Sequence, residues 1–95
     1  MPYAFIAQVQ FQDGSDPGVG QKVLESEVIP LVKAQVGFQR GTWFRNVDGK
    51  TGIGTAVFDT ETNAKAAGEA IRSQPRPAEA PTITTTGVYE VVAEA

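Results

Sequence analysis

Apolar side chains recur at every second position from the start of the chain. In residues 3–11 this spacing puts one set of apolar side chains on a single face: Tyr3, Phe5, Ala7, Val9 and Phe11. A period of two is typical of a β-strand, so residues 3–11 are predicted to form the first strand.

A helix is predicted after the turn at residues 13–17. Asp16 is a candidate N-cap and Pro17 suits the first helical position. The apolar stripe that follows has helical spacing and consists of Val23, Leu24, Val28, Leu31 and Val32. Pro30 lies inside this stripe and should bend the helix, and Gly37 is the expected C-cap. Glu25 and Glu27 lack the spacing of a metal-binding loop and are expected on the surface of the helix.

The rest of the chain predicts two strands, a helix and a last strand. Residues 38–47 and 51–58 are predicted strands joined by a hairpin at Asp48-Gly49. Asp59 or Thr60 can cap the second helix, whose inner face would be Ala64, Ala67 and Ile71, with Glu61 and Lys65 paired outside. Residues 74–81 contain three prolines and predict a stiff connection. Residues 82–93 predict the fourth strand, with Ile83, Tyr89 and Val91 opposite Val88 and Val92.

This order predicts an α+β, ferredoxin-like βαββαβ fold, an antiparallel four-stranded sheet with two helices on one face. We expect residues 1–95 to form a single domain. The first and fourth strands carry apolar residues on both faces, so the face away from the helices would expose an apolar patch. A homodimer through that sheet face is therefore expected.

The composition argues against several classes of function. There are 8 basic and 11 acidic side chains and no basic stripe, which argues against a nucleic-acid partner. No apolar run approaches the roughly 20 residues that span a bilayer, and the N-terminus lacks the basic start of a signal peptide. We therefore expect a cytoplasmic protein without membrane contact. The chain has no Cys and no His, which removes thiolate and imidazole chemistry, and no metal site is predicted.

Four side chains are catalytic candidates. Trp43 and Phe44 are strand neighbours, so one should face the helices and the other the dimer interface. Trp43 is either core packing or an aromatic platform for a flat substrate. Arg45 could hold a carboxylate or phenolate and Asn46 could hydrogen-bond an oxygen intermediate, or both could be solvated or paired across the dimer. Tyr89 could carry acid–base or redox chemistry, or could be a strand residue at a wet rim.

The sequence resembles the dimeric α+β barrel superfamily, especially proteins like the antibiotic biosynthesis monooxygenases. The resemblance is carried by residues 29–34 with Val36-Gly37-Phe38, by residues 41–45, by Asp48-Gly49 and by residues 57–61. It implies two four-stranded sheets meeting face to face in a dimer, with a pocket between each sheet and its own helices. Such proteins include oxygenases of polycyclic aromatic compounds that use no cofactor, and also haem-degrading proteins.

The resemblance leaves several functions open. Haem-degrading members place a Trp at the end of the third strand and a His on the next helix, where this chain has Phe58 and the run from Ala64. We therefore expect a small-molecule pocket protein that needs no cofactor and acts on aromatic or polyketide-like compounds. The alternative is a non-catalytic dimeric ligand-binding or stress-related protein. Isomerase-like chemistry is a third option, for which the chain offers only carboxylates and Tyr as bases.

Overall fold

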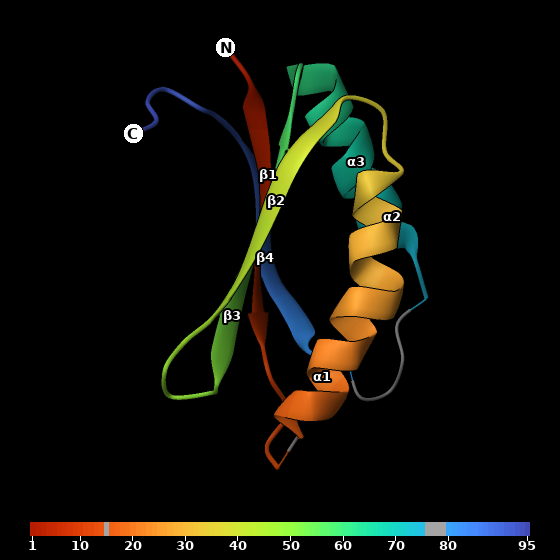
Figure 1. Ribbon diagram of the computed structural model, residues 1–95, viewed down its shortest axis with the longest axis vertical. Helices are drawn as coiled ribbons and strands as arrows, with labels where there is room; N and C mark the ends of the chain where they lie inside the picture. The colour runs from red at the N-terminus through yellow and green to blue at the C-terminus, as the bar shows by residue number, and fades with distance from the viewer. Residues whose placement is uncertain (15, 76–79) are drawn as a thin grey trace.

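The chain folds into a four-stranded antiparallel sheet with helices packed on one of its faces (Figure 1). The computed structural model describes the chain except residues 15 and 76–79. Its elements are, in order, β1 (Tyr3–Gln10), α1 (Pro17–Val23), the π-helical turn η1 (Leu24–Val28), α2 (Ile29–Lys33), β2 (Phe38–Arg45), β3 (Thr51–Phe58), α3 (Glu61–Ser73) and β4 (Thr82–Glu90). Since α1, η1 and α2 follow one another without a break, they make one long helix. The predicted ferredoxin-like βαββαβ order is thereby confirmed.

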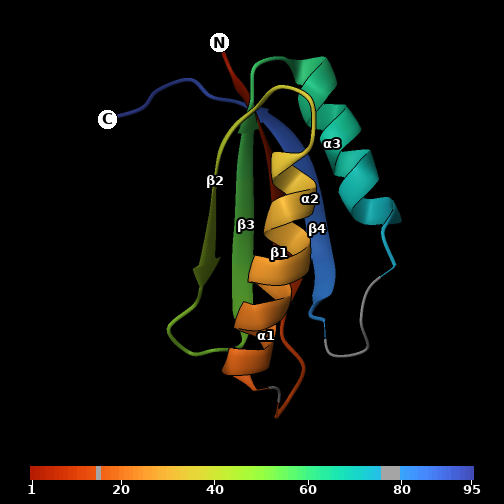
Figure 2. The ribbon, with the colours of Figure 1, turned by 45° about the vertical axis from the view of Figure 1, so that its right-hand side comes forward.

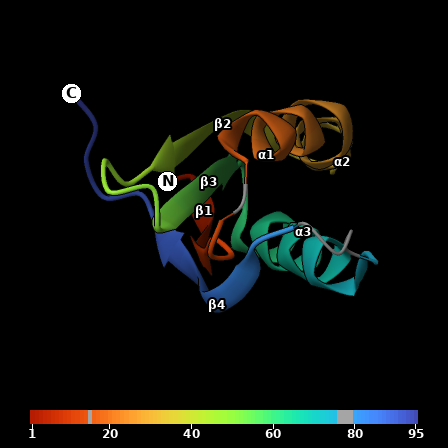
Figure 3. The same ribbon diagram turned by 90° about the horizontal axis from the view of Figure 1, so that it is seen from below.

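The strands lie in the order β2-β3-β1-β4, and every neighbouring pair is antiparallel. Figure 2 shows the long helix passing in front of the middle of the sheet, with α3 beside it. Seen from below, in Figure 3, the helices form one layer and the sheet the other. The α3 helix contacts β1, β3 and β4, whereas α2 contacts β2.

The core lies between these two layers. Phe58 is fully buried, and its ring meets that of Phe38 edge to face, with centroids 6.0 Å apart. The other buried members of the core cluster are Phe5, Val32, Ala56, Ala64 and Ala67. Ala64 and Ala67 confirm the predicted inner face of α3, and Thr60 is its N-cap, accepting a hydrogen bond from the Asn63 backbone N–H at 3.1 Å. Small residues on α3 let the helix approach the sheet closely.

The long helix begins as the sequence predicts. The Asp16 carboxylate accepts a hydrogen bond from the Gly18 N–H at 2.8 Å. Proline at position 30 has no N–H, and the helix widens to a π-turn just before it, where the Ile29 N–H bonds to the Leu24 carbonyl. The expectation that Gly37 is the C-cap was wrong: the helix ends at Lys33 with Ala34 as its cap, and Gly37 forms the following turn with φ of +83°.

The last strand differs from its predicted pattern in two ways. It ends at Glu90 rather than residue 93. It also contains a register shift opposite Gln8 and Val9, where Thr84 is an extra residue. This β-bulge moves Ile83 to the helix side, across from Val9, so the prediction that Ile83 shares the face of Tyr89 was wrong. Tyr89 and Val88 do lie on opposite faces, as expected.

The sheet face away from the helices is open, and apolar side chains lie on it. Phe44 is 55% exposed, Ile53 40% and Tyr89 56%. These side chains come from β2, β3 and β4, and half-buried Ile6 of β1 lies on the same face, across from Thr55. Phe5 and Val9 of β1 face the helices. The first and fourth strands therefore carry apolar residues on both faces, as expected, and β2 and β3 add Phe44 and Ile53 to the patch. Among the described residues, no helix is long and apolar enough to cross a membrane.

Candidate functional site

A cleft of about 770 Å³ lies between the sheet and the long helix. The sheet contributes the helix-facing side chains of β1, and the long helix contributes its apolar stripe. The C-terminal end of α3 and the residues on either side of the undescribed segment 76–79 line the remaining wall. The cleft is within the size range of ligand pockets, and its lining is mostly apolar with a few polar groups.

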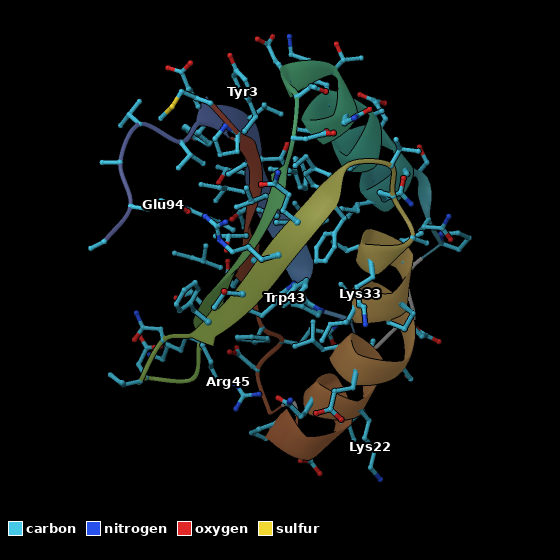
Figure 4. All side chains as sticks on the ribbon, turned by 45° about the horizontal axis from the view of Figure 1, so that its top comes forward. Tyr3, Lys22, Lys33, Trp43, Arg45 and Glu94 are labelled. Atoms are coloured by element: carbon cyan, nitrogen blue, oxygen red, sulfur yellow. The ribbon has the colours of Figure 1, made fainter. Side chains whose placement is uncertain are left out.

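Trp43 forms part of the floor of this cleft. Its side chain is half-buried on the helix side of β2, and Figure 4 shows it between the strand and the helices. The indole lies flat across two glycines. A Cβ on Gly54 would stand 2.9 Å from its Cδ1 and Nε1 atoms, and one on Gly41 would stand 2.7 Å from its Cη2 atom. The two glycines therefore allow the ring to lie down on the sheet, where its other side faces the cleft. Trp43 also packs against the core cluster, so it serves as a wall and as packing.

Arg45 lies on the same face of β2, two residues beyond Trp43, which is a separation of about 7 Å along the strand. Its guanidinium carbon is 5.9 Å from the centre of the Phe11 ring. One of its nitrogens is 3.5 Å from the Pro17 carbonyl oxygen, at the start of α1. None of the described carboxylates forms an ion pair with Arg45. The cleft therefore has an apolar floor and an unpaired cation at the α1 end.

The other two candidate side chains lie outside the cleft. Asn46 belongs to the β2–β3 hairpin, where its side-chain oxygen accepts a hydrogen bond from the Asp48 backbone N–H at 3.1 Å. That is a turn-forming contact. Tyr89 lies on the open face, with its ring over Gly87. The structure thus brings Trp43 and Arg45 together and leaves Asn46 and Tyr89 apart from them.

The cleft also contains residues that the sequence patterns did not single out. Glu27 is exposed on the helix surface, as expected, and also lines the cleft. The sequence could have predicted this position, because Glu27 lies three residues after Leu24 and four before Leu31 within the apolar stripe. Ile83 was missed because the bulge in β4 reverses its face. Phe11 was placed on the correct face but not assigned to a site.

A second polar contact lies on β1 and β4. The Tyr3 hydroxyl is 3.4 Å from the Glu90 carboxylate. This negative charge raises the pKa of the Tyr3 phenol, and desolvation and Glu61 raise it further, whereas Lys65 lowers it. Glu90 is exposed, so it is paired at the surface rather than held as a buried carboxylate.

The lining of the cleft favours binding an aromatic molecule with an acidic group. Trp43 and Phe11 offer ring faces, and Arg45 offers a planar set of donors that suits a carboxylate or phenolate. Within the described residues, no group of three acidic side chains is placed to hold a metal ion. Trp43, Phe11 and Arg45 offer stacking, hydrogen bonding and stabilisation of an anion.

Comparisons with known proteins agree with this architecture. No protein family matches the sequence, and no curated protein is significantly similar to it. Among solved structures, SnoaB, a cofactor-independent oxygenase from Streptomyces nogalater, superposes with a TM-score of 0.67 at 14% identity, covering 98% of this chain and 95% of SnoaB. A haem-degrading protein from Mycobacterium tuberculosis has a TM-score of 0.63 at 19% identity, covering 100% of this chain and 99% of that one. A variant of MhuD with two manganese protoporphyrin IX molecules per active site has a TM-score of 0.67 at 18% identity, with coverages of 98% and 97%.

At these identities the likeness concerns the fold, and it spans nearly the whole of each chain. The same arrangement serves an oxygenase without a cofactor and proteins that bind or degrade porphyrins. The chain has the ferredoxin-like fold of these monooxygenase-like and haem-degrading proteins, as its sequence resemblance implied.

Proposed function

We propose that this protein binds a flat aromatic small molecule in the cleft and oxidises it with dioxygen, without a cofactor. The observation that carries the proposal is the position of Trp43, laid flat over Gly41 and Gly54 on the floor of an open cleft with Arg45 beside it. A roomy cleft with a Trp and an Arg favours such chemistry, because the ring can stack on the indole and the anion can pair with the guanidinium. The likeness of fold to a cofactor-independent oxygenase supports it further.

The proposed reaction requires only that the protein stabilise the substrate anion and hold its ring in place. An electron-rich phenol or enol that has lost its proton can reduce dioxygen itself. When a ring methylene becomes a carbonyl, one oxygen atom enters the product and the other leaves as water, and the substrate supplies all the electrons. The protein stabilises the substrate anion through Arg45 and holds the ring against Trp43, away from bulk water.

A non-catalytic ligand-binding role is the second candidate. Its support is that Asn46 and Tyr89, which could have served an oxygen intermediate or a proton transfer, lie outside the cleft. The cleft then holds a ligand through Trp43 and Arg45 without changing it.

Oxygen uptake separates these two functions. Purified protein, freed of metals by chelation, is mixed with a series of aromatic quinols and anthrone-like compounds in an oxygen electrode. An oxygenase consumes one dioxygen per product faster than the quinol autoxidises, and Trp43→Phe slows this reaction because ring contact is reduced. Binding by calorimetry without oxygen uptake favours the second candidate. If no compound of the series binds or reacts, the proposed site is wrong.

We also propose that two copies associate through the open face of the sheet. Phe44, Ile53 and Tyr89 expose apolar area there, and an obligate dimer interface of about 2,000 Å² or more would cover it. The clefts lie on the opposite faces of the two sheets, so the dimer leaves both accessible.

A further inference from the structure

Glu27 is the acidic side chain among the described residues that line the cleft. It lies in the π-turn, which carries Leu24, Glu27 and Val28 all on the cleft side of the helix. A π-turn inside an α-helix is uncommon and is often found at functional sites. Glu27 is exposed on the cleft side of the helix, so its carboxylate is accessible to a ligand bound in the cleft.

The Glu27 carboxylate has no partner within the described part of the chain. The ion pairs involve other residues, and no described side chain or backbone group donates a hydrogen bond to Glu27. Glu25, two residues away, accepts a hydrogen bond from the Gln21 side chain at 2.9 Å and does not line the cleft. The two carboxylates on one helix thus differ in direction and in contacts.

Glu27 and Arg45 are placed some distance apart along the cleft. Arg45 reaches the carbonyl of Pro17, the first residue of α1. Glu27 is ten residues further along the helix, about 15 Å at the usual rise. Trp43 lies on the floor of the same cleft. An elongated ligand that stacks on Trp43 would therefore meet a cation at one end and a carboxylate acceptor toward the other.

We propose that Glu27 determines the specificity of this cleft, by selecting an aromatic acid that carries a hydroxyl group on the ring far from its carboxylate. This inference rests on the proposed function, since it assumes that the cleft binds aromatic molecules through Trp43 and Arg45. The ligand carboxylate meets Arg45, and the ligand hydroxyl donates its hydrogen bond to Glu27. A carboxylate accepts but does not donate, so an ether at the same place lacks a partner.

Two probes test this selection. One is a naphthoic acid with a hydroxyl on the far ring, and the other is the same acid with a methoxyl there. Calorimetry on the full chain should show that the hydroxy acid binds at least about tenfold more tightly than the ether, because a hydrogen bond to a charged acceptor is lost in the ether. In Glu27→Gln the two acids should bind about equally, since an amide both donates and accepts. Glu25→Gln should keep the preference of the unaltered protein.

The outcomes separate the two proposals. If both acids bind the unaltered protein equally, or if Glu27→Gln keeps the preference, the role of Glu27 is wrong while the cleft remains a binding site. If neither acid binds, both the proposed function and the role of Glu27 are wrong. Denaturant midpoints of the two variants serve as the folding control, and they should match that of the unaltered protein because both side chains are exposed.

Discussion

Gly54 on β3 lies directly across from Trp43 on β2, and the absence of a side chain at Gly54 is what lets the indole lie flat on the sheet. The geometry leaves no space for a methyl group, because a Cβ there would be 2.9 Å from two indole atoms. Gly54→Ala should therefore lift the ring into the cleft. Overpacking of this kind costs about 1–3 kcal/mol of unfolding free energy, which a shift in denaturant midpoint would measure. The fluorescence of Trp43, the chain's one tryptophan, should change at the same time.

Gly20→Ala is the matched control for that substitution. Nothing lies within 4 Å of a Cβ built on Gly20, which is within α1. Alanine should stabilise the helix by about 0.5–1 kcal/mol without moving Trp43. Equal effects of the two substitutions would contradict the close fit between Gly54 and the indole.

The contact between Tyr3 and Glu90 predicts an effect on alkaline titration. Glu90 raises the pKa of the Tyr3 phenol above its usual 10.0, so the folded state keeps this proton longer than the unfolded state does. The associated stability is present below about pH 10 and is lost as the pH rises through the folded pKa. Glu90→Gln should lower the pKa of Tyr3 and make the alkaline loss of stability smaller. In a Tyr89→Phe background Tyr3 is the remaining tyrosine, so its absorbance reports the titration directly.

Glu61→Gln is the comparison for this experiment. Glu61 raises the pKa of Tyr3 less than Glu90 does, so its replacement should lower that pKa by a smaller amount. A titration midpoint that does not move in Glu90→Gln would rule out the proposed coupling.

The open sheet face predicts the state of association. Light scattering at micromolar concentration should give twice the chain's 10.1 kDa. Phe44→Glu or Ile53→Glu should split the dimer, because either substitution would bury a charge among apolar side chains at the interface. Val36→Glu should not, although Val36 is 77% exposed, since it lies in the connection between α2 and β2 rather than on the sheet. If the unaltered protein is a monomer under these conditions, the open face of the sheet does not mediate a stable dimer.

Much of the fold follows from local patterns in the sequence. The period-two alternation in β1 correctly grouped Phe5 and Val9 on one face of the strand, and the caps at Asp16 and Thr60 are where capping residues predict them. One exception comes from an inserted residue, because Thr84 in the β4 bulge reverses Ile83. An alternation pattern carries no mark of such an insertion, because pairing with the neighbouring strand decides it.

The sequence predicted less of the candidate site than of the fold. Trp43 and Arg45 share a face because they are two residues apart, which the sequence does show. Asn46 is just beyond the end of the strand, and its contact with Asp48 is typical of an Asn placed before a turn. The distance between Tyr89 and the cleft depends on which face of the sheet the helices cover, and that choice is made by packing across the whole domain.

Saturable quenching of Trp43 by a naphthoic acid tests the central claim, that the cleft between sheet and long helix is a binding site built on Trp43 and Arg45. The unaltered protein should show a saturable curve. Arg45→Met should weaken binding about tenfold, because a charged hydrogen bond to the carboxylate is lost. Lys22→Met removes a cation that points away from the sheet (Figure 4) and should leave the curve unchanged. Linear, unsaturated quenching, or equal weakening by both substitutions, would contradict the account.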